Sequence, residues 1–267
     1  MEEFLSSVEA ATERAISVIV VDNGSSDIDE LRRIVAGHPV AQLLELNENR
    51  GYGGAMNAGI EAAMSDAKYV LIANPDVSFR PGSVDLLIDE AESTPTGGAF
   101  GPGILNVDGS LYPSARALPS LRTGIGHALF AKRWPSNPWT SRYRAASPRP
   151  NGLMQAGWLS GACILVRASA FRQVGGFDTS YFMYFEDVDL GDRLGARGWL
   201  NVYVPEARVV HTGAHSTSHS SAAMDVAHHE SAYRYLSRRY SAGYLAPLRG
   251  FLRVSLALRS WWQVRKH

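Results

Sequence analysis

The chain has 267 residues, of which 45% are hydrophobic, so it can bury the core of one large domain and is not a disordered protein. Its 26 basic and 26 acidic residues cancel, which argues against a nucleic-acid partner. Cys163 is the single cysteine; this excludes an intramolecular disulfide and is typical of a reducing compartment. Neither a signal peptide nor an apolar run of about 18 residues is found, so we expect a cytoplasmic protein.

The first hundred residues alternate between helical and extended patterns. Phe4, Leu5 and Val8 predict a short amphipathic helix, and the β-branched run at 16–21 predicts a buried strand that stops at turn residues. Further helices are predicted at 27–38, 53–65 and 83–94, and further strands at 41–49 and 68–76. This alternation is typical of a doubly wound α/β fold, in which helices flank a mostly parallel central sheet.

The pattern fades from about residue 100 to about 155, where Pro, Gly, Arg and Trp dominate. We expect long surface connections there, and such loops often carry binding function. Regular structure is predicted again from GWLSGACILVRASAFRQVGGFD, at residues 157–178.

Polar residues follow three of the predicted strands, at DNGSSD (22–27), NENRGYGG (47–54) and NPD (74–76). Each stretch alone is compatible with an ordinary turn or a helix N-cap. In open α/β sheets, however, ligands bind beyond the carboxyl ends of the strands, and backbone N–H groups at a helix start suit a phosphate. Three such stretches in succession therefore predict a ligand site.

The run YFMYFEDVDLGDRL (181–194) places Glu186, Asp187 and Asp189 within four positions. Acidic residues favour the first turn of a helix, so a helix start is the structural interpretation. A carboxylate that takes a proton from an attacking group is the functional one. Crowding by neighbouring carboxylates raises proton affinity, whereas a nearby metal lowers it, so the sequence leaves the pKa undecided.

The motifs DNGSSD, NENRGYGGAMNAGI, NPDV, SGACILVR, VGGFD and YFEDVDLGDRL resemble, in order and spacing, those of the inverting family 2 glycosyltransferases. The resemblance covers essentially residues 1–240. It implies a GT-A fold with a nucleotide-binding half at about 1–100 and an acceptor half at about 101–230. Residues 231–267 would form a basic amphipathic helical tail.

The resemblance implies three roles in catalysis and metal binding. Asp187 matches the family's catalytic base. Asp76 matches the last residue of its metal-binding DxD motif, in which Asn74 here replaces the first Asp. His211, after another predicted strand, matches a histidine at the metal or diphosphate site. The implied cofactor is Mg²⁺ or Mn²⁺, which oxygen ligands suit.

Other positions match the substrate sites of the family. Trp158 alternatively packs in the core, and Arg50 is alternatively a surface charge. The resemblance places Asp22, Asn23, Asn49, Arg50, Gly51 and Asn74 at the nucleotide sugar. It places Trp158, Ser160, Gly161 and Glu186 at the sugar and acceptor pocket.

Within the family, phrases such as YPSAR, GWLSG and AHST are similar to those of actinobacterial rhamnosyltransferases. The implied donor is dTDP-L-rhamnose, and the implied acceptor is the polyprenyl-diphosphate-linked sugar N-acetylglucosaminyl-diphospho-decaprenol, from which the arabinogalactan linker of the cell wall is built. Two alternatives stay open. One is another dTDP- or UDP-sugar donor with a different polysaccharide acceptor; the other is a non-catalytic sugar-nucleotide-binding protein, favoured by Asn74.

Both ends of the chain carry further expectations. After Glu230 there are eight bases and no acid, so residues 248–267 predict a basic amphipathic helix lying on the inner face of the cell membrane. A packing helix with a solvated basic face is the alternative. Family members begin with an apolar strand ahead of the helix that EEFLSSVEA resembles, and we expect the natural start to lie upstream.

Overall fold

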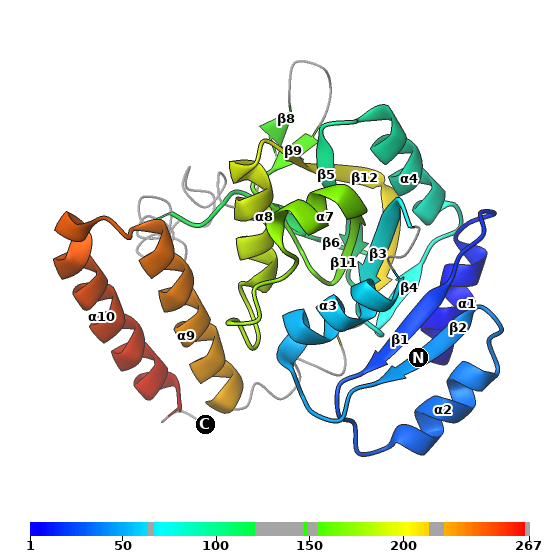
Figure 1. Cartoon of the computed structure of the whole chain (residues 1–267), viewed down its shortest axis with the longest axis horizontal. Helices are drawn as coiled ribbons and strands as arrows, with labels where there is room; N and C mark the ends of the chain where they lie inside the picture. The colour runs from blue at the N-terminus through cyan, green and yellow to red at the C-terminus, as the bar shows by residue number, and fades with distance from the viewer. Residues whose placement is uncertain (64–66, 121–146, 149–153, 214–221, 265–267) are drawn as a thin grey trace.

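The computed structural model describes residues 1–63, 67–120, 147–148, 154–213 and 222–264 (Figure 1). The helices are α1 (Glu2–Ala10), α2 (Ile28–Ala36), α3 (Gly51–Ala63), α4 (Ser83–Ser93), α7 (Ala168–Val174), α8 (Glu186–Ala196), α9 (Ala222–Arg239), the 3₁₀ turn η1 (Gly243–Leu245) and α10 (Ala246–Val264). The strands are β1 (Val18–Asp22), β2 (Ala41–Glu45), β3 (Tyr69–Ala73), β4 (Val77–Phe79), β5 (Gly97–Leu105), β6 (Leu111–Tyr112), β7 (Ala115–Arg116), β8 (Ser147–Pro148), β9 (Met154–Ala156), β10 (Trp158–Leu159), β11 (Cys163–Arg167) and β12 (Leu200–His211). The elements predicted for the first hundred residues are confirmed, with ends that differ by a few residues.

The main sheet has eight strands, with the path β3-β11-β5-β12-β9-β8 and with β4 and β6 paired beside it. Strands β5 and β12 are parallel, whereas β11 is antiparallel to both β3 and β5, and β9 is antiparallel to β12. The prediction of a mostly parallel sheet is therefore wrong for this sheet. Strands β3, β5 and β12 do run in one direction, but β11 enters between the first two and makes the neighbouring pairs antiparallel.

Strands β1 and β2 form a separate parallel sheet of two strands, in register from Val18–Ala41 to Asp22–Glu45. In the part of the chain that the structure describes, β3 is an edge of the main sheet and β1 is an edge of the small one. The two sheets are joined through α3, which packs on both β1 and β3.

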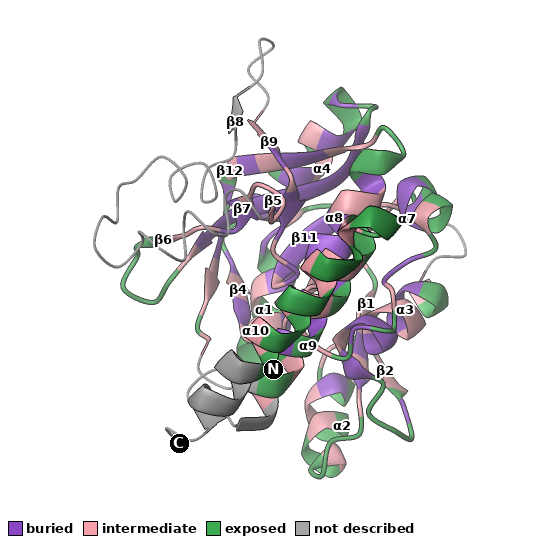
Figure 2. Ribbon diagram, turned by 90° about the vertical axis from the view of Figure 1, so that its left-hand side faces the viewer, coloured by how far each residue is buried: buried purple, intermediate pink, exposed green. Residues whose placement is uncertain are grey.

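Strand β5 overturns the expectation of surface connections after about residue 100. Its sequence GGAFGPGIL is buried along almost its whole length, as the purple central strands in Figure 2 show. A Cβ atom at Gly97 would lie 2.1 Å from the Phe100 ring, and one at Gly101 would lie 2.7 Å from Leu159. Glycines are required here by close packing, although their composition is typical of a loop. The rest of that prediction falls largely on 121–146 and 149–153, outside the described residues.

Helices cover both faces of the main sheet. Leu87 and Ala91 of α4 pack against Phe100 and Leu165. Helices α3, α7 and α8 pack against the neighbouring positions of the same strands, including Ala99 and Ile164. Because successive side chains of a strand point to opposite faces, α4 lies on one face and the other three helices lie on the second. The core is closed on both sides.

The C-terminal helices α9 and α10 pack against each other as a hairpin at the left of Figure 1. Ser231, Ala232 and Tyr235 of α9 are buried, so this helix is part of the body of the protein. The predicted boundary between residues 230 and 231 falls inside α9, not between elements. Among the described residues, no helix is long and apolar enough to span a bilayer.

Candidate active site

The turn Ser160-Gly161-Ala162, between β10 and β11, contacts three of the predicted site segments. The Tyr52 hydroxyl donates to the Gly161 carbonyl oxygen at 2.6 Å, and the Asn74 N–H donates to the Ala162 carbonyl oxygen at 2.9 Å. The Gly161 N–H donates to Asp187 Oδ2 at 3.0 Å. A Cβ atom at Gly161 would contact Tyr52 and Asp187 at 3.4 and 3.5 Å. Residues that are far apart in the sequence therefore meet at this turn.

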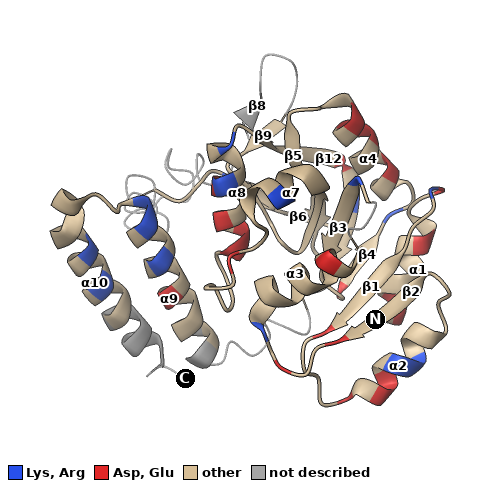
Figure 3. Ribbon diagram, in the orientation of Figure 1, with Lys and Arg blue, Asp and Glu red and all other residues tan. Residues whose placement is uncertain are grey.

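Glu186 and Asp187 begin α8 and form the acidic part of the site, visible as red at the start of α8 in Figure 3. Asp187 Oδ1 also accepts from the Val188 N–H at 2.8 Å, so both of its carboxylate oxygens are held by backbone donors. Glu186 is 8% exposed, and its Oε2 atom is buried without a hydrogen-bond partner among the described residues. The two neighbouring carboxyl groups thus differ in hydrogen bonding: Asp187 has two backbone donors, whereas Glu186 Oε2 has none among the described residues.

Burial raises the pKa of both groups. For Glu186, desolvation and then the charge of Asp187 raise the pKa to about 8. For Asp187, desolvation raises the pKa above its ordinary value, while the hydrogen bonds from Gly161 and Val188 and the charge of Arg116 lower it. With a pKa of about 8, Glu186 is largely protonated at neutral pH. An oriented carboxylate with a raised pKa is suited to general base catalysis.

The backbone just before these carboxylates is strained. Tyr184 and Phe185 both have positive φ, at 66° and 67°, which side chains other than glycine rarely adopt. Helix α9 holds this segment: Ser231 Oγ donates to the Met183 carbonyl oxygen at 2.8 Å, and the Tyr235 ring packs on Phe185. The His228 ring contacts both strained side chains edge-on. Sequence reasoning missed these α9 contacts.

The two predicted nucleotide loops are joined by hydrogen bonds. Asn23 Nδ2 donates to Asn49 Oδ1 at 3.0 Å, and Asn23 Oδ1 accepts from the Arg50 N–H at 2.8 Å. Gly51 has a φ of 71°, and a Cβ atom there would lie 2.3 Å from the Phe182 carbonyl oxygen. The same oxygen accepts from the Tyr52 N–H at 3.1 Å, so these loops also contact the segment that leads to Asp187.

Asp22 and Arg50 are predicted to bind the nucleotide sugar, but both have partners within the protein. These partners fit the alternatives of an ordinary turn for Asp22 and a surface charge for Arg50. The buried Asp22 carboxylate accepts from the backbone N–H groups of Gly24 and Ser25, as in an ordinary Asx turn. The Arg50 guanidinium is half-exposed and lies 3.3 Å from a Glu48 carboxylate oxygen. Nucleotide binding by either side chain stays a prediction.

Asp76 and His211 are in contact, although 135 positions separate them: His211 Nε2 lies 3.0 Å from Asp76 Oδ1. Antiparallel pairing of β4 with β12 places His211 opposite Val77. Asp76 Oδ2 is buried without a partner among the described residues, so an oxygen ligand is available. No cluster of three or more His, Cys, Asp or Glu side chains occurs in the described ranges. The pair fits a cation that completes its shell with substrate oxygens and water.

Trp158 packs in the core, as its structural interpretation holds, with 7% exposure and its indole N–H donating to the Ala117 carbonyl oxygen at 3.2 Å. Its ring lies under the guanidinium of Arg116, a residue that the site prediction missed. Tyr52 was missed as well. Cys163 is a buried free thiol with a pKa raised by desolvation, as expected for a small core residue.

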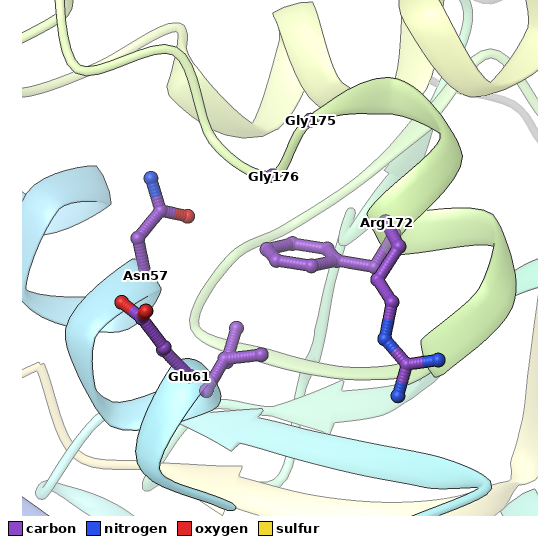
Figure 4. A pocket seen from close by; sticks show the side chains of 7 residues that line it. Asn57, Glu61, Arg172, Gly175 and Gly176 are labelled. Atoms are coloured by element: carbon purple, nitrogen blue, oxygen red, sulfur yellow. The ribbon is translucent and has the colours of Figure 1, made fainter. Parts of the chain in front are cut away.

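A separate pocket of about 470 Å³ lies between α3 and α7 and is lined by Asn57, Ile60, Glu61, Phe171, Arg172, Gly175 and Gly176 (Figure 4). None of the predicted site residues lines it. Asn57 exchanges two hydrogen bonds with the backbone of Phe177, which fixes the VGGFD turn against α3. The pocket is a gap beside this structural contact.

Comparison with known proteins relates this chain to glycosyltransferases. The family model described as "Glycosyl transferase family 2" matches residues 1–175, and "Glycosyl transferase family group 2" matches residues 143–266. An N-acetylglucosaminyl-diphospho-decaprenol L-rhamnosyltransferase of Mycobacterium tuberculosis is 51% identical over 99% of this chain and 89% of its own length. Rhamnosyltransferase WbbL of Escherichia coli is 32% identical over 66% of this chain and 64% of its own length.

Two solved structures share the fold. GalNAc-T7 with UDP, GalNAc and Mn²⁺ has a TM-score of 0.59 at 13% identity, covering 95% of this chain and 51% of its own. The mannosyltransferase PcManGT of Pyrobaculum calidifontis, with GDP-Man and Mn²⁺, has a TM-score of 0.58 at 17% identity. The match covers 99% of this chain and 68% of the mannosyltransferase chain. These likenesses confirm the predicted GT-A-like fold.

Proposed function

This chain belongs to glycosyltransferase family 2, and from that membership we propose that it transfers L-rhamnose from dTDP-L-rhamnose to N-acetylglucosaminyl-diphospho-decaprenol. The observation that carries the proposal is the Asp187 carboxylate, fixed by two backbone N–H groups at the turn where the predicted donor and acceptor segments meet. The 51% identity to the M. tuberculosis rhamnosyltransferase supports the choice of sugar and acceptor.

The reaction is a single displacement with inversion. An acceptor hydroxyl oxygen attacks the anomeric carbon of rhamnose, the bond from that carbon to the diphosphate oxygen breaks, and the electron pair leaves with dTDP. Asp187 takes the hydroxyl proton. Its raised pKa makes its carboxylate a stronger base than that of an ordinary aspartate. The protonated Glu186 lies beside it in the acceptor pocket and adds no second negative charge.

Asp76 and His211 are the residues that would hold Mg²⁺ or Mn²⁺. When bound, the cation would neutralise charge that develops on the departing diphosphate. The fold neighbours solved with Mn²⁺ support this assignment. Asn23, Asn49 and Gly51 would form the nucleotide-sugar side, with Asp22 and Asn74, because their loops are hydrogen-bonded to each other and contact the segment that leads to Asp187.

The basic C-terminal helix would hold the enzyme against the membrane that contains its acceptor. Phe251 and Val254 of α10 are 68% and 59% exposed, and Tyr244 just before it is 84% exposed. All charged residues in the described part of α10 are basic and are drawn blue in Figure 3, because no acidic residue follows Glu230 in the sequence. Exposed apolar side chains among arginines suit the headgroup region of an anionic leaflet. The protein would then work at the inner face of the cell membrane.

The test is transfer of radiolabelled rhamnose from dTDP-rhamnose to a short-chain N-acetylglucosaminyl-diphospho-prenol, with added Mg²⁺, Mn²⁺ or EDTA. We expect transfer by the wild type and a fall of roughly 10²–10⁴-fold in kcat for Asp187→Asn, the range for loss of a general base. Asp89→Asn, on the exposed face of α4, is the matched control. No transfer by the folded wild type with any cation, together with tight dTDP binding, would identify a non-catalytic nucleotide-binding protein.

A further inference from the structure

Arg116 lies one strand from the turn that holds Asp187. It pairs opposite Trp158 in the β7–β10 ladder, and the Gly157 N–H donates to its carbonyl oxygen at 2.8 Å. On the same ladder, the Ser160 N–H donates to the Ser114 carbonyl oxygen at 2.8 Å. Strand β7 therefore runs along the edge of the Ser160-Gly161-Ala162 turn, and Arg116 belongs to the surroundings of the catalytic carboxylate.

The guanidinium of Arg116 is held in place by aromatic rings. Its Cζ atom lies 5.4 Å from the centroids of both the Tyr112 and the Trp158 rings, within the range of a cation–π contact. Its Nε donates to the Pro113 carbonyl oxygen at 2.6 Å. A side chain that normally has many rotamers is thus already oriented.

This half-buried cation has no carboxylate partner within the described residues. Two arginines that contact α8 do have one: Arg193 pairs with Asp189 at 2.6 Å and Arg239 with Asp192 at 2.8 Å. The Asp187 carboxylate feels the positive charge of Arg116 but hydrogen-bonds Gly161 and Val188 instead. Among the described residues, the two remaining nitrogens of the Arg116 fork have no hydrogen-bond partner, which leaves them available for an anion.

The sequence around Arg116 also lacks negative charge. Between Asp108 and Asp178 the chain contains no Asp or Glu. The same stretch contains nine basic residues, Arg116, Arg122, Lys132, Arg133, Arg142, Arg144, Arg149, Arg167 and Arg172. In a chain whose total charge is zero, the positive charge is thus concentrated in this stretch of the sequence.

We propose that Arg116 binds a diphosphate group of a substrate and so holds that substrate beside Asp187. The role rests on the proposed function, in which both the donor and the acceptor carry a diphosphate. A planar guanidinium fork matches two phosphate oxygens at once, and aromatic rings behind it keep the fork pointed at the ligand. The proximity of Arg116 to the base favours the acceptor's diphosphate over the donor's.

The experiment compares wild type, Arg116→Gln and Arg116→Lys, with Arg172→Gln as the control from the same acid-free stretch. Binding of dTDP and of farnesyl diphosphate is measured by calorimetry, and KM is measured for each substrate. We expect Arg116→Gln to weaken one diphosphate ligand roughly 10- to 100-fold, as loss of a charge-assisted pair does, with a smaller loss in Arg116→Lys. Arg172→Gln should match the wild type.

The two ligands separate the possible sources of the diphosphate. Weaker farnesyl diphosphate binding and a higher acceptor KM identify the acceptor; weaker dTDP binding and a higher donor KM identify the donor. Unchanged affinities for both ligands in a folded Arg116→Gln protein would overturn the proposal. Because the binding measurements need no turnover, they test diphosphate binding by Arg116 even if rhamnose proves to be the wrong sugar. The Lys variant keeps the charge over the rings and serves if the Gln variant does not fold.

Discussion

At the scale of single residues, the site depends on the protonation of two adjacent carboxyl groups, those of Glu186 and Asp187. Asp187 has two backbone donors, and Glu186 has a buried oxygen with none among the described residues. Desolvation and then the charge of Asp187 raise the pKa of Glu186 to about 8. The family motif predicts that Asp187 is the base. It could not predict the protonation of its neighbour, because that depends on burial.

The raised pKa of Glu186 makes stability depend on pH. A carboxyl group whose folded-state pKa lies above its unfolded value binds more protons when folded, so its contribution is lost as pH rises from the unfolded value of about 4.5 toward 8. We expect the Tm of the wild type to fall over this window relative to that of Glu186→Gln. For a protein of this size, each kcal/mol of unfolding free energy shifts Tm by roughly 2–4 °C. Melting curves of both proteins and of the exposed control Glu30→Gln, recorded from pH 5 to pH 9, would measure this difference in Tm. The same pH dependence of Tm in wild type and Glu186→Gln would contradict the prediction.

Gly51 tests the junction between the nucleotide loop and the catalytic segment. Gly51→Ala places a Cβ atom 2.3 Å from the Phe182 carbonyl oxygen at a φ of 71°. Gly82 has nearly the same φ, 74°, but a Cβ atom added there would meet no other atom within 4 Å. Both alanines cost the strain of a left-handed residue, about 1–2 kcal/mol. We expect only Gly51→Ala to lose further stability and transfer activity, as denaturant titration and the rhamnose assay would show; equal losses would rule out the steric effect.

Sequence reasoning found residues within motifs and missed those defined by neighbouring strands. The family resemblance implied a shared site for Asp76 and His211, and the structure brings the two side chains to 3.0 Å. Arg116 was missed because its importance lies in a cross-strand partner, Trp158, and in the carboxylate that it lacks among the described residues. An acid-free stretch of the sequence was the available signal.

At the scale of elements, α9 supports the strained residues in front of α8. Tyr235 donates to Asp192 of α8 at 2.9 Å, and Arg238 pairs with Asp178. Together with the Ser231 and His228 contacts, these bonds offset the cost of two positive φ values, about 1–3 kcal/mol each. Helix α9 therefore fixes the backbone that leads to Glu186 and Asp187, and we expect it to affect catalysis through their position.

Ser231→Ala tests this support. The substitution leaves the Met183 carbonyl oxygen without its donor, which costs about 1–3 kcal/mol of stability. We expect kcat to fall several-fold while KM for the donor stays unchanged, because the base moves and the nucleotide loops do not. Ser241→Ala, exposed just beyond α9, is the control. A stability loss with unchanged kcat would show that Ser231 is only structural.

Strand β5 shows why the second half of the fold was harder to predict than the first. Residues 1–94 carry periodic apolar patterns, and their elements follow those patterns. In GGAFGPGIL the strand is specified by the small size of its residues, since Phe100, Leu159 and Trp199 occupy the space of the missing side chains. That requirement is visible only once the neighbouring elements are in place.

At the scale of the whole molecule, the α9–α10 hairpin projects away from the β1–β2 end in Figure 1. We expect the full chain to sediment with vesicles that contain phosphatidylglycerol and not with pure phosphatidylcholine. A double change of Arg249→Glu and Arg253→Glu should weaken binding, since each basic residue near such a surface contributes about 1 kcal/mol. Arg32→Glu on α2, far from this hairpin in the sequence, is the control. Equal binding to both lipids would contradict the electrostatic basis of the proposal.

The division of the strands into two sheets also has a consequence for cooperativity. The β1–β2 pair shares no backbone hydrogen-bond ladder with the main sheet among the described residues, so it can open at a lower free energy than the rest. Amide hydrogens of Val18–Asp22 should then exchange sooner than those of Cys163–Arg167. A donor nucleotide that contacts both Asn23 and Asp76 would link the two units, and its binding would slow exchange most in the smaller one. Hydrogen exchange would thus detect donor binding in a protein that turns nothing over.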